Sequence, residues 1–133
     1  MNSRPLLTLR LVTAPTREVG ATPHGALMVF PVTGGTFEGE RLRGKVLSGG
    51  GDWVTVAADG TLSLDLRVTL ETDDGALIYM TFTGIRDDAR GYFRTLPRFE
   101  TAAEKYGYLN RLMAIGIGTI GPGGPVHAIE EIL

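Results

Sequence analysis

The stretch that decides the fold is LSLDLRVTLE, residues 62–71, in which apolar and polar residues alternate without a break. Successive side chains of a β-strand point to opposite faces, so this pattern predicts a strand with one apolar and one polar face. The turn sequence DDG at residues 73–75 follows directly, and a second extended segment over residues 76–83 completes a hairpin.

Similar short segments recur along the chain at intervals of about ten residues. Further strands are expected over residues 6–13, 26–33, 41–47, 53–57, 91–99, 108–118 and 126–133, with a loop over residues 14–25. Thr101 and Glu104 form a capping-box pattern, so at most one short helical turn is expected near residues 102–106. The pattern predicts an all-β fold, a small antiparallel β-barrel of about eight strands, with a β-sandwich as the alternative.

Length and composition indicate one domain spanning residues 1–133. An apolar fraction of 43% can fill a single core, and a formal charge of −2 without a basic cluster argues against nucleic-acid binding. The chain has no cysteine, no apolar run long enough for a membrane span and no signal-peptide pattern, so we expect a cytoplasmic protein away from membranes. A slightly positive mean hydropathy of +0.08 suggests a homo-oligomer, a dimer or higher, that covers apolar surface.

A glycine-rich run, SGGGDW at residues 48–53, precedes the 62–71 strand. Three consecutive glycines allow a tight turn and deliver an acid, Asp52, and the only tryptophan, Trp53, at its end. These two residues form either a ligand wall or a structural pair, in which Asp52 caps the turn and Trp53 anchors the core.

The polar face of the 62–71 strand has two alternative orientations. If it faces water, Asp65 and Arg67 are solvated and the leucines fill the barrel. If it faces inward, the acid and the guanidinium share a confined space with Tyr79. Over residues 108–118 one face is small or polar and the other is aliphatic, and small residues suit the inside of a narrow barrel. We therefore favour a polar interior, with the aliphatic outer face covered by a partner subunit.

The segments from Gly39 to Gly75 resemble one known family in combination. GERLRGKVLSGGGDW and DGTLSLDLRVTLETDDG, followed later by YFRT, FET and YLNR, are similar to domain-of-unknown-function family 3237, also described as uncharacterised protein family 0311. The family usually has tryptophan where this chain has Tyr108, so another aromatic takes that place. The resemblance implies a small antiparallel β-barrel, oligomeric, and it brings no established reaction.

The residues suggest a cofactor-free acid–base site on a small carbonyl or carboxylate compound, of the isomerase, cyclase or lyase type. A carboxylate, Asp65 or alternatively Glu100 or Asp52, would remove a proton, and Arg67 would stabilise the developing oxyanion. The expected catalytic set is Asp65, Arg67 and Glu100, and the expected ligand-binding set is Asp52, Trp53, Asp74, Tyr79, Tyr108 and Asn110. The alternative is a non-catalytic barrel that binds a small organic ligand or is purely structural, with Arg67 in a structural ion pair.

Other motifs carry less weight. The sequence GIGTIG, residues 116–121, matches a dinucleotide-binding fingerprint, but the following PGGP rules out the helix that such a site needs. His24 and His127 lack metal-ligand spacing, so we expect neither a metal nor a cofactor, and both should be surface or interface residues. Ser48 has no evident histidine partner for hydrolase chemistry.

Overall fold

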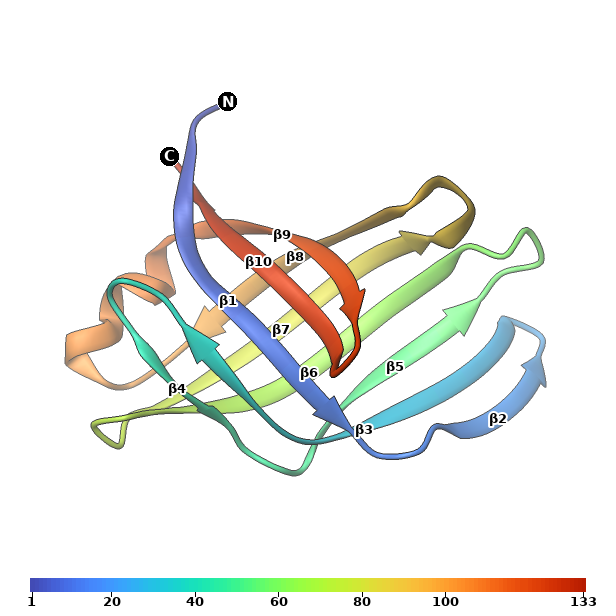
Figure 1. Ribbon diagram of the computed structural model, residues 1–133, viewed down its shortest axis with the longest axis horizontal. Helices are drawn as coiled ribbons and strands as arrows, with labels where there is room; N and C mark the ends of the chain where they lie inside the picture. Colours follow the sequence, from blue (N-terminus) through green and yellow to red (C-terminus); the bar gives the residue numbers. More distant parts are fainter.

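The computed structural model describes all 133 residues and contains ten β-strands and two short 3-10 helices (Figure 1). The strands are β1 (Ser3–Thr13), β2 (Arg17–Thr22), β3 (Gly25–Glu38), β4 (Arg43–Val46), β5 (Gly50–Val56), β6 (Leu62–Thr72), β7 (Leu77–Asp87), β8 (Tyr92–Glu100), β9 (Met113–Gly121) and β10 (Gly124–Ile132). The helices η1 (Asp88–Arg90) and η2 (Glu104–Arg111) connect β7 to β8 and β8 to β9. Neither helix is long and apolar enough to cross a membrane.

The strands form one antiparallel sheet that closes on itself. β1 pairs with β10 on one side and with β3 on the other, which completes the barrel. The long β3 pairs with β2 and β5 through its first half and with β1 and β4 through its second half. β4 and β5 share one position between β3 and β6, so eight positions close the barrel and β2 is an extra edge strand. This confirms the predicted barrel over the sandwich.

Close strand packing explains one of the glycines in β3. Gly35 has φ +138°, and a Cβ atom there would overlap the carbonyl oxygen of Arg10 on β1. Only glycine combines that backbone conformation with so close an approach, so Gly35 lets the β1–β3 seam close.

The predicted polar interior is wrong, because the apolar face of β6 points inward. Leu64, Leu66, Val68 and Leu70 are all buried, whereas Asp65 and Arg67 face outward. Burying the leucines removes a large apolar area from water, while burying the two charges would cost their hydration.

The small residues of β9 do line the interior, as expected, but they make room for apolar neighbours. A Cβ on Gly118 would lie 2.6 Å from the ring of Phe93 on β8. The small face of one strand therefore accommodates a large ring from the next.

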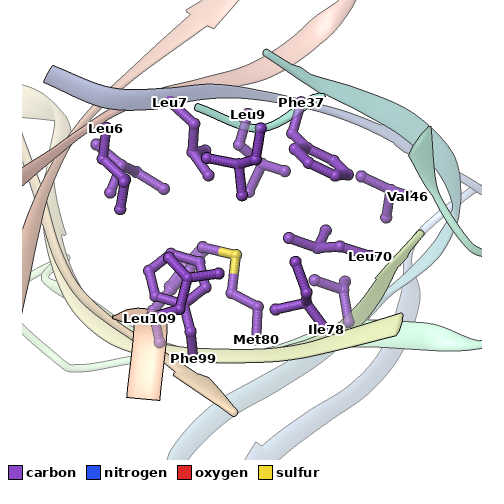
Figure 2. Packing of buried hydrophobic residues seen from close by; sticks show 14 of the residues in the cluster. Leu6, Leu7, Leu9, Phe37, Val46, Leu70, Ile78, Met80, Phe99 and Leu109 are labelled. Atoms are coloured by element: carbon purple, nitrogen blue, oxygen red, sulfur yellow. The ribbon is translucent and has the colours of Figure 1, made fainter. Parts of the chain in front are cut away.

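Most of the core fills one end of the barrel. Nineteen buried residues pack there, and Figure 2 shows side chains of β1, β3 and β4 meeting those of β6, β7, β8 and η2. η2 lies at this end of the barrel and inserts Tyr106 and Leu109 into the core (Figure 1). A separate cluster of Val54, Leu64 and Phe93 lies toward the other end.

Three local predictions differ from the structure. Residues 14–25, expected as a loop, contain β2, whose backbone pairs with the projecting half of β3. The helical turn expected at 102–106 extends through Gly107 to Arg111, because tertiary burial of Leu109 outweighs the low helix propensity of glycine. That extension delays β9 to Met113, and η1 adds a second short helix.

Candidate functional site

The predicted catalytic pair lies on the outer wall of the barrel. Asp65 and Arg67 have side chains that are 49% and 59% exposed, and Arg67 Nε lies 3.8 Å from Asp65 Oδ1. The structure therefore places them in a loose surface ion pair, without an enclosed cavity around them. Glu100, the third predicted catalytic residue, is exposed at the end of β8.

Two of the predicted ligand-binding residues share this outer wall. Trp53 is 41% exposed and its ring lies against Gly51 of the same strand, so it is not a core anchor. Tyr79 is 40% exposed and pairs across the sheet with Glu100, so both residues lie outside the barrel.

The remaining predicted residues at the η2 end hold that end together. Asp74 accepts hydrogen bonds from Thr72 Oγ1, from Lys105 Nζ at 2.8 Å and from Tyr106 Oη at 2.9 Å. Asn110 exchanges two hydrogen bonds with the backbone of Thr101, at 2.8 and 2.9 Å.

Tyr108 packs beneath a guanidinium at the same end. Arg41 lies 4.6 Å from the centre of its ring, and the tyrosine hydroxyl is buried without a hydrogen-bond partner. Burial raises the pKa of Tyr108. The ligand-binding role of Tyr108 stays a prediction.

The structure brings polar groups together inside the barrel at the opposite end. A cavity of about 50 Å³ opens there between the ends of β1, β3, β5, β6, β7, β8, β9 and β10. We call it the Asp52 chamber; its lining residues are Leu11, Thr13, Phe30, Val32, Asp52, Val54, Leu62, Leu64, Arg86, Phe93, Ile120, Pro125 and His127. Its only titratable side chains are Asp52, Arg86 and His127, which lie among apolar walls.

Asp52 points into the chamber from the middle of β5. It shares the inward face of this strand with the buried Val54, and its Oδ1 atom is buried without a hydrogen-bond partner. Burial raises the pKa of Asp52 to about 6, helped by the Asp65 carboxylate and opposed by the Asp65 backbone and the Arg86 guanidinium. A carboxyl group with this pKa can accept and return a proton near neutral pH.

His127 enters the chamber from β10, and the expectation of a surface or interface residue is wrong. It is 2% exposed, its Nδ1 atom has no hydrogen-bond partner, and it packs against the rings of Phe82 and Phe93 at 4.9 and 5.2 Å. Burial lowers the pKa of His127 to about 4, so its imidazole is neutral at neutral pH. The signal was its parity with Ile129, which shares the buried face of β10.

Arg86 supplies the positive charge at the chamber, and the sequence reasoning did not single it out. Its Nε and Nη2 atoms donate to Asp88 at 2.7 and 3.1 Å, and its guanidinium lies 5.5 Å from the ring centre of Phe93. These bonds leave Nη1 for another acceptor. The β6–β7 register contained the signal, because Arg86 pairs with Leu62, whose side chain also lines the chamber.

Comparisons with known proteins show which family this chain belongs to. The family model described as "Protein of unknown function (DUF3237)" matches residues 1–132. The chain belongs to this family. A UPF0311 protein of Rhodopseudomonas palustris is 31% identical over 130 residues, which cover 86% of this chain and 85% of the relative.

Solved structures of other proteins share the fold of this chain. A beta-barrel like protein from Acinetobacter baumannii superposes with a TM-score of 0.91 at 34% identity, covering 98% of this chain and 94% of that one. The hydroalkoxylation enzyme phnH of Penicillium herquei is 38% identical over 85 residues, which cover 64% of this chain and 52% of the relative. An enzyme structure from the same fungus superposes with a TM-score of 0.79 at 26% identity, covering 98% of this chain and 94% of that one.

The chamber of this DUF3237 family member brings three titratable side chains together among apolar walls. It has no group of three or more His, Asp or Glu side chains that could hold a metal ion. It does combine a proton acceptor, a fixed cation and a neutral imidazole in apolar surroundings, where electrostatic interactions are stronger than in water.

Proposed function

We propose that this protein is a cofactor-free acid–base enzyme. It adds the O–H bond of a substrate hydroxyl group across the conjugated carbon–carbon double bond of a small carbonyl compound. The observation that carries the proposal is Asp52, a largely buried carboxyl with an unpartnered oxygen beside Arg86 in an apolar chamber. A structural carboxylate in such a place is normally paired, because unpaired burial is costly.

The relatives support this reaction class over other acid–base chemistry. The Penicillium relative is named a hydroalkoxylation enzyme, and hydroalkoxylation is the addition of an alcohol O–H across a double bond. The reaction joins two groups without oxidation or reduction, so it needs only proton transfer and charge stabilisation.

In the proposed cycle Asp52 carries the proton. Its carboxylate takes the proton of the substrate hydroxyl while that oxygen bonds to the β-carbon, and the π electrons move to the carbonyl oxygen to give an enolate. The Arg86 Nη1 group donates to the enolate oxygen and stabilises its charge. Asp52 then returns the proton to the α-carbon, which restores both the carbonyl and the carboxylate.

His127 orients the substrate in this scheme. A neutral imidazole offers one N–H donor and one acceptor nitrogen. With its ring held between Phe82 and Phe93, it can fix the direction of the attacking hydroxyl. The aromatic rings around it favour a flat, conjugated substrate that inserts its reacting edge into the chamber.

The test uses 2′-hydroxychalcone, whose phenol closes onto its own enone to give flavanone. We expect the protein to accelerate ring closure and to favour one enantiomer, measured by absorbance and chiral chromatography. In D₂O the enzyme should also exchange the α-protons of flavanone, detected by mass spectrometry. Asp52→Asn should lose both activities while it stays folded, with a melting temperature no lower than that of the wild type.

The second candidate is a non-catalytic ligand-binding barrel. The unpartnered Asp52 Oδ1 and His127 Nδ1 atoms favour it, since a bound ligand can satisfy both of them without any reaction. Aryl enones that bind by calorimetry without turnover or proton exchange would support this candidate and overturn the enzyme. Turnover that survives Asp52→Asn would remove Asp52 from the reaction.

A further inference from the structure

We propose that the outer wall of β5 to β8 binds a second copy of this chain around a two-fold axis. The axis runs across the strands, along the row in which Asp52, Leu66, Phe82 and Pro97 are paired neighbours. This surface faces away from the Asp52 chamber, so the inference does not depend on the proposed reaction.

The outer wall exposes more apolar side chain than a solitary barrel needs. Trp53, Tyr79, Ile85 and Leu96 are 41%, 40%, 43% and 57% exposed on three strands of this wall, β5, β7 and β8. A groove over Gly84 opens beside Ile85 and Leu96, and four hydroxyl-bearing residues are among the others that line it. Apolar patches of this kind on a soluble protein mark interaction sites.

The total surface is also larger than expected for a monomer. The chain exposes 7705 Å², whereas a compact monomer of 14.3 kDa exposes roughly 6,800 Å². The excess of roughly 900 Å² is close to the ~800 Å² that each partner buries in a standard interface.

The charges of the wall are arranged symmetrically about the proposed axis. Asp65 and Arg67 lie one residue to either side of Leu66 on β6, and Arg94 and Glu100 lie three residues to either side of Pro97 on β8. A two-fold axis across the strands places each position on one side over its counterpart on the other side. Asp65 then meets the partner's Arg67, and Arg94 meets the partner's Glu100, so both of these contacts join opposite charges, while Arg98 lies over the partner's Leu96.

The apolar residues follow the same symmetry. Ile85 and Tyr79 lie three residues to either side of Phe82, so Ile85 packs on the partner's Tyr79. Trp53 and Gly51 flank Asp52, and the Trp53 ring lies over Gly51 of its own strand, so the indoles of the two copies meet each other at the axis. Tryptophan and tyrosine are the residues that most often dominate binding energy at interfaces.

The alternative two-fold axis along the strands is disfavoured by the same residues. Where that axis follows β6, it places Asp65 on the partner's Asp65 and Arg67 on the partner's Arg67, and where it follows β7, it places Arg67 over the partner's Arg98. Like charges directly opposite each other repel. Charge complementarity therefore selects the axis across the strands.

The test is charge exchange at β6, with the full chain in analytical ultracentrifugation. The wild type should sediment as a dimer. Asp65→Arg and Arg67→Asp should each weaken the dimer at least about 100-fold, because each creates two like-charge contacts. The double variant Asp65→Arg/Arg67→Asp should restore the dimer. Arg10→Asp, a charge reversal on the far wall, should leave it intact.

Fluorescence of the only tryptophan gives a second readout. Trp53 emission should shift to shorter wavelength as the wild type is concentrated, and it should stay at long wavelength in Arg67→Asp. Circular dichroism confirms that each variant is folded. A monomeric wild type, a dimer indifferent to the single reversals, or a double variant that does not recover would overturn the proposal.

Discussion

Two aspartates lie at opposite ends of the same barrel, Asp52 in the chamber and Asp74 in the β6–β7 turn beside η2. Asp74 accepts three side-chain hydrogen bonds, whereas Asp52 Oδ1 accepts none. The hydrogen bonds from Lys105, Thr72 and Tyr106 hold the pKa of Asp74 well below its usual range, whereas burial raises that of Asp52. Hydrogen bonds therefore favour the ionised form of Asp74 at one end, and burial favours the protonated form of Asp52 at the other.

The two ends of the barrel also differ in how densely they are packed and in how many of their polar groups are paired. At the η2 end the interior is filled by the large leucine-rich cluster, and the polar groups on the rim satisfy one another. At the chamber end a smaller, separate cluster of three buried residues packs beside a cavity. The well-packed end, where most of the polar side chains are paired, stabilises the barrel, and this allows the other end to retain unpaired polar groups.

The largest expected effect is on activity, which should depend on Asp52 and not on Asp74. Asp52→Asn removes the proton acceptor and should lower kcat/KM for ring closure of 2′-hydroxychalcone by roughly 10²–10⁴-fold. Asp59→Asn is the matched control, since Asp59 only accepts a hydrogen bond from the Thr61 amide in the exposed β5–β6 turn. Asp74→Asn should instead lower the melting temperature, because it weakens the bond to Lys105. A kcat/KM for Asp52→Asn equal to that of the control would contradict the contrast.

The next effect is the acid sensitivity that His127 brings to the chamber end. Its pKa is about 4 in the folded protein and 6.5 without perturbation, so folding favours the neutral form. This contribution is complete above pH 6.5 and is lost as the pH falls toward 4, a loss of about 3 kcal/mol in the free energy of unfolding. His127→Gln should remove it, measured by urea unfolding at pH 4 and pH 7. Equal pH slopes in variant and wild type would show that His127 is accessible to protons when folded.

Asp52 should change the free energy of unfolding slightly less than His127 does, and with the opposite dependence on pH. Its pKa rises from 3.8 to about 6 on folding, so its contribution is complete below pH 3.8 and is lost as the pH rises to 6. Asp52→Asn should therefore gain about 2–3 kcal/mol over the wild type between pH 4 and pH 8. The two titrations oppose each other between pH 4 and 6, so the wild type should show a shallow pH profile that either variant steepens. A Carbon-13 NMR titration of the Asp52 carboxyl gives its pKa directly.

The contrast between the ends also shows what the sequence could predict. Alternation at residues 62–71 and the DDG turn determine a hairpin, and evenly spaced strands determine a barrel, because both depend on local periodicity. The sequence prediction was wrong about which face of the 62–71 strand points inward. That orientation depends on which residues of all eight strand positions compete for the interior, and Asp65 and Arg67 face outward. His127 and Arg86 lie far from Asp52 in the chain and meet it only through the β-sheet register. Asp52 itself was recognised, because the glycine run delivers it to the barrel end.

The smallest effect compares two tyrosine hydroxyls at the η2 end. Tyr106 Oη donates to Asp74 at 2.9 Å, so Tyr106→Phe should cost about 1 kcal/mol in the free energy of unfolding. Tyr108 Oη is buried without a partner, so Tyr108→Phe removes an unsatisfied group and should be neutral or slightly stabilising. The two substitutions delete the same atom two residues apart, and urea unfolding of both measures what pairing contributes at this end. Equal losses in the two variants would show that Tyr108 finds a partner in solution, and the packed end would then be paired throughout.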